Sequence, residues 1–161
     1  MSALQDKKAK HDISPNQVWD EILLLRAVLY RIRELELRKV GLTPEQAGII
    51  HAVKQSHNRI IPAQIAPISR RKPETISLIL RRMEKSGLVR LIKDLDKKNM
   101  IRVELTVVAE QKLKDGVENF VQTEKVFDVL SAEELNEFSY FIRKLDARAM
   151  QVWNEIKTER L

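Results

Sequence analysis

Cysteine is absent from this chain of 161 residues, so it contains no disulfide, no thiolate nucleophile and no sulfur-ligated zinc finger. Glycine is scarce, at four residues, and no glycine-rich phosphate loop is present. The sequence also lacks a paired-ligand motif and a serine set in a nucleophile elbow. These absences argue against catalysis, and we expect neither an enzyme nor a bound cofactor.

Long apolar runs are also missing. Nowhere do about 18 apolar residues follow one another, and the opening MSALQDKKAKHDIS has lysines without an apolar segment behind them. These features predict a cytoplasmic protein with no membrane partner. A hydrophobic fraction of 43% and a charged fraction of 32%, with few glycines for loops, are typical of a helix-rich chain. The length fits one domain, or a small domain with an assembly element, since domains usually run roughly 100 to 200 residues.

Positive charge is concentrated in one segment. Residues 54–102 contain 13 Lys or Arg against 4 Asp or Glu, a balance of +9 within a total of +6, which leaves −3 for the rest of the chain. Such a segment is typical of binding to phosphate backbones, because neutralised phosphates release condensed counterions. A solvated charged face would give the same composition, so the surrounding elements have to decide between the two.

Three helices are predicted between residue 14 and the first part of the basic segment 54–102. Ser14 and Pro15 begin the first helix, whose apolar side chains recur every three or four residues until the chain approaches Gly41. Thr43 caps the second helix, which extends to about residue 55. The third, in the segment IPAQIAPI, is expected to be short because Pro67 lacks an N–H and crowds the preceding turn.

A longer helix is predicted over residues 73–86, in KPETISLILRRMEKSGLV, and Gly87 ends it. Its apolar stripe repeats at about 100° per residue and comprises Ile76, Ile79, Leu80 and Met83. The opposite face is formed by Glu74, Leu78, Arg81 and Lys85, with Thr75, Ser77 and Arg82 beside the stripe. A binding partner of this helix would therefore meet mostly polar and cationic side chains.

The pattern changes beyond Gly87, where apolar and polar residues alternate as they do in strands. The segments LVRLIK and MIRVELT carry the alternation, and the polar segment DLDKKN separates them. This arrangement predicts a β-hairpin with Lys97 and Lys98 at its tip. A helix from Thr106 is expected to carry apolar side chains as far as Val121, and Ser131 with Glu134 caps a long last helix.

The order of these elements is that of a winged helix-turn-helix, in which a helix enters the major groove of DNA and a hairpin reaches the adjoining minor groove. The expected fold is mainly α with a small β-hairpin wing. Residues 42–106 would form the DNA-binding domain, residues 14–41 and 107–161 a helical dimerisation layer, and residues 1–13 a flexible basic tail. The predicted DNA contacts are Arg70, Arg71, Lys72, Thr75, Ser77, Arg81, Arg82, Lys97 and Lys98.

A winged helix can also serve as a protein-interaction or RNA-binding module, and such a module might dimerise through the same terminal helices. Composition does not separate this alternative from sequence-specific binding to duplex DNA. The two differ in whether the chain selects particular duplexes.

The segment ETISLILRRMEKSGLV, followed by a hairpin and then Leu105 and Thr106, resembles the MarR family of bacterial and archaeal regulators. The resemblance covers most of the chain and includes QIA in the third helix. It implies a triangular homodimer with interlocking terminal helices. It also implies two winged heads on a near-palindromic operator, action most often as a repressor, and release by a small ligand.

This sequence departs from the family pattern at the predicted interface. Where the family often has arginine in the recognition helix, this chain has Leu78, which can touch a thymine methyl but cannot bind guanine with two hydrogen bonds. Where relatives carry arginine at the wing tip, this chain offers Lys98 or Asn99. We therefore expect an operator preference that differs from the family's.

Trp19, Tyr30 and His51 lie on the first two helices, near where related proteins keep an effector pocket, and are the candidate ligand-binding residues. Filling of the core or of an interface by these aromatic side chains is the alternative. His51 and His57 are six residues apart, a spacing that turns them away from each other on one helix. We therefore expect no metal site.

Overall fold

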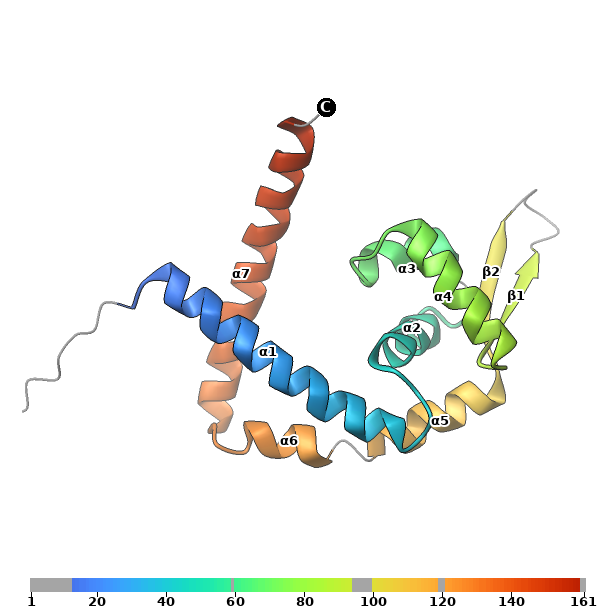
Figure 1. Cartoon of the computed structure of the whole chain (residues 1–161), viewed down its shortest axis with the longest axis horizontal. Coiled ribbons are helices and arrows are strands. Elements are labelled where there is room, and N and C mark those ends of the chain that lie inside the picture. The colour runs from blue at the N-terminus through green and yellow to red at the C-terminus, as the bar shows by residue number, and fades with distance from the viewer. Residues whose placement is uncertain (1–12, 59, 94–99, 119–120, 160–161) are drawn as a thin grey trace, which may run out of the picture. The chain divides into compact units, whose positions relative to one another are not determined.

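The computed structural model describes residues 13–58, 60–93, 100–118 and 121–159 (Figure 1). The chain divides into two compact units, Met1–Asn119 and Phe120–Leu161. The first unit contains α1 (Pro15–Arg38), α2 (Pro44–Gln55), α3 (Pro62–Ile68), α4 (Pro73–Lys85), β1 (Val89–Lys93), β2 (Ile101–Leu105) and α5 (Val107–Glu118). The second contains α6 (Val121–Phe127) and α7 (Ala132–Glu159). The expected fold class, mainly helical with one small hairpin, is confirmed.

The first two helices begin where their capping residues predict. The backbone N–H of Gln17 donates to Ser14 Oγ at 3.3 Å, and the N–H of Ser14 donates to the Gln17 side chain at 2.9 Å. Thr43 and Gln46 make the same reciprocal pair at 3.2 and 2.9 Å. Each pair satisfies two backbone donors that a helix terminus otherwise leaves unpaired. Pro67 lies inside α3, which ends one residue later and is as short as predicted.

Helix α4 ends at a left-handed glycine. Gly87 has φ +71°, a conformation that costs a glycine little because it has no Cβ. The N–H groups of Leu88 and Gly87 donate to the carbonyls of Met83 and Glu84, at 2.8 and 3.0 Å. These bonds satisfy the last carbonyls of the helix in a Schellman motif. The chain therefore leaves α4 in a fixed direction and enters β1 directly.

The core of the first unit lies beneath α4. Ile76, Leu80 and Met83 on its inner face are fully buried, as the predicted apolar stripe requires, and Ile79, the fourth residue of that stripe, is half-buried. The other fully buried large side chains come from the end of α1, from α2, from α3 and from both strands; they include Leu37, Ile49, Ile50, Val53, Ile65, Val89 and Val103. Figure 1 shows α2, α3 and α4 gathered beside the β1–β2 hairpin. This compact head fixes the outward face of α4.

The hairpin is antiparallel, with Leu91 opposite Val103 and Val89 opposite Leu105. A segment that precedes α3 adds to its edge: the N–H of Val103 donates to the carbonyl of Ile60 at 2.9 Å in an isolated bridge. The side chain of Asn58 accepts the N–H of Leu105 at 3.1 Å. Strand β2 is therefore hydrogen-bonded to the α2–α3 connection on one side and to β1 on the other.

Helix α5 returns to the end of α1. The ammonium of Lys112 donates to the carbonyl of Val40, in the turn between α1 and α2. A Cβ added at the buried Gly116 would lie 3.4 Å from side-chain atoms of both Leu37 and Val40, so a glycine allows α5 to lie close to this turn. The segments by which the chain enters and leaves the head are thus in contact.

One expected helix is corrected. The sequence predicts a single helix from Thr106 through Val121, but α5 ends at Glu118 and Val121 belongs to the separate helix α6. Gly116 in the last turn of α5 favours this ending, because glycine in a helix costs about 1 kcal/mol relative to alanine. The cap of the last helix is confirmed, since Ser131 and Glu134 exchange hydrogen bonds at 2.8 and 3.2 Å.

Both long helices expose apolar stripes. In α1 only Glu36 and Leu37 are buried among the described residues, whereas Trp19 is 61% exposed. In α7 no described residue is buried, and its exposed apolar side chains include Leu135, Phe138, Phe141, Ile142, Leu145, Trp153 and Ile156. Both helices are thus amphipathic, and exposed apolar stripes of this kind are typical of protein–protein contact surfaces.

Candidate nucleic-acid interface

The outward face of α4 is the centre of the candidate interface. Glu74, Leu78, Arg81 and Lys85 are all exposed on it, and Arg82 is exposed beside them. Leu78 is 55% exposed although it is a large apolar residue. The structure therefore places these side chains where the helical pattern predicts, opposite the buried stripe.

Two small polar residues flank this face. Thr75 and Ser77 are half-buried, between the outward face and the core. The hydroxyl of Ser77 donates to the carbonyl of Pro73 at 3.0 Å. Because that bond uses the only hydroxyl hydrogen, the oxygen of Ser77 is left to act as an acceptor. The two predicted contacts therefore differ. Ser77 can only accept a hydrogen bond from DNA while it donates to Pro73, whereas this restriction does not apply to Thr75.

Three cationic residues lie before the first turn of α4. Arg70 adopts the left-handed conformation with φ 50°, and Lys72 occupies the N-cap position of the helix with its side chain exposed. A guanidinium nitrogen of Arg71 lies 3.0 Å from a carboxylate oxygen of Glu45, at the start of α2. The sequence places all three together, but it gives no sign that Arg71 is tied to another helix.

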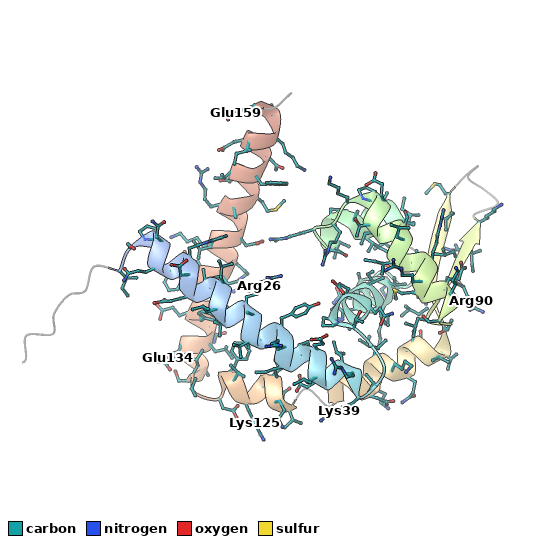
Figure 2. All side chains as sticks on the ribbon, viewed as in Figure 1. Arg26, Lys39, Arg90, Lys125, Glu134 and Glu159 are labelled. Atoms are coloured by element: carbon teal, nitrogen blue, oxygen red, sulfur yellow. The ribbon has the colours of Figure 1, made fainter. Side chains whose placement is uncertain are left out.

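The wing is described along its strands. Lys97 and Lys98, the predicted tip residues, lie outside the described residues. Arg90 and Lys93, which sequence reasoning did not single out, are exposed on β1, and Figure 2 labels Arg90 on the hairpin. The Nη2 of Arg90 lies 3.8 Å from a carboxylate oxygen of Glu104 on the opposite strand. The alternation of apolar and polar residues in the sequence identifies the strands, but it does not show which of their cationic side chains are available to bind DNA.

A side-chain contact connects the wing to α4. Oε1 of Glu84, in the last turn of the helix, accepts the N–H of Leu91 in β1 at 2.9 Å. An edge strand generally presents a row of unpaired backbone groups, and this hydrogen bond satisfies one of them on β1. The recognition helix and the first strand of the wing are therefore held by a hydrogen bond as well as by the short turn at Gly87. Sequence reasoning had no signal for this pair.

The structure does not gather the three candidate ligand residues around one cavity. Tyr30 borders a cavity of about 230 Å³ whose other walls come from α2, α4 and the end of α3, including Ile49, Ile68, Ile76, Ile79, Glu45 and Arg71. Trp19 and His51 are exposed and do not line it. His51 Nε2 instead lies 2.8 Å from the side-chain nitrogen of Gln55, one turn further along α2. The apolar lining of this cavity comes from all of these helices, and Ile76 and Ile79 are the contribution of the inner stripe of α4.

No group of three or more His, Asp or Glu side chains suited to a metal ion occurs among the described residues. His57 lies in the turn after α2 with φ 54°, while His51 is within the helix. Within the described ranges, no helix is long and apolar enough to cross a membrane.

No protein-family model matches the sequence, and no curated protein matches it significantly. Solved structures do match. The organohalide-sensing transcriptional regulator RdhR, in its 2,4-dichlorophenol-bound form, has 26% identity and a TM-score of 0.73, over 92% of this chain and 89% of that one. AbsC, a MarR-family transcriptional regulator from Streptomyces coelicolor, has 19% identity and a TM-score of 0.77, over 86% and 97% of the two chains.

The chain has the MarR-family fold. A variant of MarR from E. coli, complexed with operator DNA, has 16% identity and a TM-score of 0.74, over 80% of this chain and 92% of that one. The MarR fold covers nearly the whole chain, so the resemblance drawn from the recognition-helix motif is confirmed in three dimensions. These matched structures are of regulators rather than enzymes.

Proposed function

We propose that the chain is a cytoplasmic, sequence-specific DNA-binding transcription regulator, without catalytic activity, that acts as a homodimer on a near-palindromic operator and represses transcription. The observation that carries the proposal is the geometry of α4. Its inner stripe is buried, its outer face exposes Arg81, Arg82 and Lys85, and a hairpin follows directly. The MarR variant solved with operator DNA has the same fold, which supports this use of the helix.

In this proposal α4 lies in the major groove and its flanking cations bind phosphates. Arg70, Arg71 and Lys72 stand at the N-terminal end of the helix, where Glu45 competes with phosphate for Arg71, and Arg81 and Arg82 lie further along it. Thr75 donates to a base edge or phosphate, and Ser77 accepts. Lys97 and Lys98 supply the wing's positive charge to the minor groove, where lysine acts as a point charge without guanidinium geometry.

Dimerisation is proposed to use the exposed stripes of residues 14–41 and 107–161. A helix with many exposed apolar residues is stabilised when a partner surface covers it, and a two-fold symmetric homodimer is the commonest way to provide one. A two-fold dimer presents two copies of α4, and these match the two halves of a palindrome. Sedimentation at micromolar concentration tests this step, and a monomer would contradict it.

We further propose that a small ligand in the cavity beside Tyr30 releases the DNA. Ile76 and Ile79 line this cavity from the inner side of α4, so a bound molecule would press on the recognition helix itself. Arg71 and its partner Glu45 place an ion pair at the border of the cavity, which can form hydrogen bonds with a polar group of a ligand. RdhR has the same fold and was solved with 2,4-dichlorophenol, which supports a regulator that responds to a compound of this size.

The decisive test is the salt dependence of binding to duplexes selected from a random pool. Arg81→Ala should weaken binding to all duplexes and lower the slope of log affinity against log salt by about one, whereas Thr75→Ala should relax the preference at one base step. Lys125→Ala removes an exposed cation from α6 and serves as the matched control. Affinity that does not change with salt would contradict the proposal, and failure to enrich any palindrome would favour an interaction module.

A further inference from the structure

The N-terminal half of the outward face of α4 carries a carboxylate and a leucine, and we propose that this pair reads pyrimidine edges in the major groove. Glu74 accepts a hydrogen bond from the N4 amino group of cytosine, and Leu78 packs against the 5-methyl group of thymine. The inference rests on the proposed function, since it requires α4 to enter the groove. It adds which bases the helix selects.

The positions of the two side chains suit a short base step. Both are exposed, and residues four apart on a helix lie one above the other on the same face. Their separation along the helix axis is about 6 Å. Successive bases along one strand are about 3.4 Å apart. The selected cytosine and thymine should therefore be adjacent or separated by one base pair.

Leu78 lies outside the buried core of the first unit. It is 55% exposed, while Ile76 and Leu80 on either side of it are fully buried and supply the core contact of this turn. A leucine side chain cannot pair with the acceptors of guanine or adenine, and leaving those acceptors desolvated is unfavourable. Among the groups at base edges in the major groove, the thymine methyl is the apolar one. Leu78 therefore favours thymine and disfavours purines.

Glu74 is informative because its charge has the wrong sign for a phosphate backbone. A carboxylate brought near phosphates is repelled unless a donor compensates it. Cytosine N4 is such a donor in the major groove. The competing explanation is structural, since an acidic residue in the first turn of a helix interacts favourably with the helix dipole. That role predicts no base preference, so base selection distinguishes the two explanations.

Glu74 and Leu78 read bases in addition to Thr75, and the residues around them have other roles. Ser77, beside Leu78, already gives its hydroxyl hydrogen to the carbonyl of Pro73. The exposed cations Arg81 and Lys85 lie in the C-terminal half of α4, and Lys72 occupies its N-cap, where they can hold the phosphates. In this proposal affinity comes mainly from these cations, and selectivity from the N-terminal half of the outward face.

The experiment uses the full chain and duplexes that the wild type selects from a random pool. Each enriched thymine is replaced in turn by uracil, which removes only the methyl group. One thymine per half-site should show about a fourfold loss of affinity, the amount expected from one methyl contact. Leu78→Ala should bind the thymine and uracil duplexes equally, while Leu78→Met should retain part of the difference.

The Glu74 half of the proposal has its own readout. Replacing the selected cytosine by N4-methylcytosine, which blocks the amino hydrogen facing the groove, should cost the wild type roughly tenfold in affinity. Glu74→Gln should change the selected base at that position from cytosine to adenine, because glutamine pairs with the N6 and N7 atoms of adenine. Glu74→Ala should bind unselected duplexes more tightly than the wild type, since a repelling charge is gone.

Three outcomes distinguish the proposed base reading from the proposed DNA-binding function. Ile13→Ala shortens an exposed apolar side chain outside both α4 and the proposed dimerisation layer, and should leave the selected sequence unchanged. Affinity of the wild type that is unaffected by uracil at every position would overturn the role of Leu78. An unchanged base choice by Glu74→Gln would overturn that of Glu74. Both results are compatible with salt-dependent duplex binding, whereas a wild type that enriches no duplex would remove the proposed function itself.

Discussion

Arg71 lies 3.0 Å from Glu45 and joins the turn before α4 to the first turn of α2. Both side chains are close to half exposed, so the pair contributes at most about 1 kcal/mol to stability. The pair matters because it engages the guanidinium of Arg71. A cation at the N-terminal end of the proposed recognition helix is held by a carboxylate of the same chain, beside the cavity that Tyr30 also borders.

Glu45→Gln should therefore strengthen binding to all duplexes. Without its carboxylate partner, Arg71 becomes available to a phosphate, and the slope of log affinity against log salt should steepen by about one. The free energy of unfolding should change by less than about 1 kcal/mol. Fluorescence anisotropy over a series of salt concentrations measures the first effect, and urea denaturation the second.

A matched control is available on α1. Glu34 forms a 3.7 Å pair with Arg38, away from α4, and Glu34→Gln makes the same change of charge. It should leave the salt slope unaltered. Equal effects of the two variants would mean that net charge, rather than the release of Arg71, determines the affinity.

Truncating a side chain to alanine should change the free energy of unfolding much more on the inner face of α4 than on its outer face. Leu80 is fully buried, so Leu80→Ala should destabilise the protein by about 2 to 5 kcal/mol. Leu78→Ala should stay within about 0.5 kcal/mol of the wild type, because that side chain is mostly in water. Chemical denaturation monitored by circular dichroism compares them. A large loss of stability in Leu78→Ala would place Leu78 in the core and remove it from the interface.

The hydrogen bond between Glu84 and Leu91 should control the opening of the wing. Glu84→Ala removes the acceptor of the Leu91 N–H. The expected loss is about 0.5 to 1.5 kcal/mol of local stability, seen as faster hydrogen exchange of the Leu91 amide. Glu84→Gln keeps a side-chain oxygen and should preserve most of the protection. Unchanged exchange in the alanine variant would show that β1 does not depend on this contact.

The start of α7 should be sensitive to acid. The backbone N–H of Ser131 and then its hydroxyl form hydrogen bonds with the Glu134 side chain, which Figure 2 labels, and they lower the pKa of that carboxyl below its ordinary value. A lowered pKa in the folded state means that the contribution to stability is present above the unfolded pKa, about 4.3, and is lost as pH falls through the folded pKa.

A carbon-13 NMR titration of the Glu134 carboxyl measures this directly. Ser131→Ala should raise its pKa toward the ordinary value, because the hydroxyl bond is lost while the backbone bond persists in a weakened cap. A pKa that does not move would mean that the backbone N–H alone sets it.

Local signals in the sequence predicted most of the helical framework. Ser14, Thr43 and Ser131 each stand one residue before a helix, as predicted, and all three make a reciprocal cap, although the sequence predicted the capping partner only for Ser131. Pro67 limits α3, and the spacing of Ile76, Leu80 and Met83 identifies the buried side of α4. These features depend on residues within about one turn of each other, so the sequence is sufficient to place them.

What the sequence did not predict depends on distant residues. The bridge between Ile60 and Val103 and the hydrogen bond from Leu105 to Asn58 join segments more than 40 residues apart, and neither leaves a periodic pattern. The cavity beside Tyr30 is likewise assembled from four separate segments. For that reason the aromatic residues of the first two helices identified one wall of the cavity, Tyr30, but not the aliphatic walls.

The contact between Lys112 and Val40 has a mechanical consequence. The chain enters the head just after Val40 and leaves it along α5, so both covalent connections pass through one place. A displacement of α1 relative to α5 at this point would reach the head through both connections at once. In the proposed dimer we therefore expect this contact to couple the terminal helices to the orientation of α4.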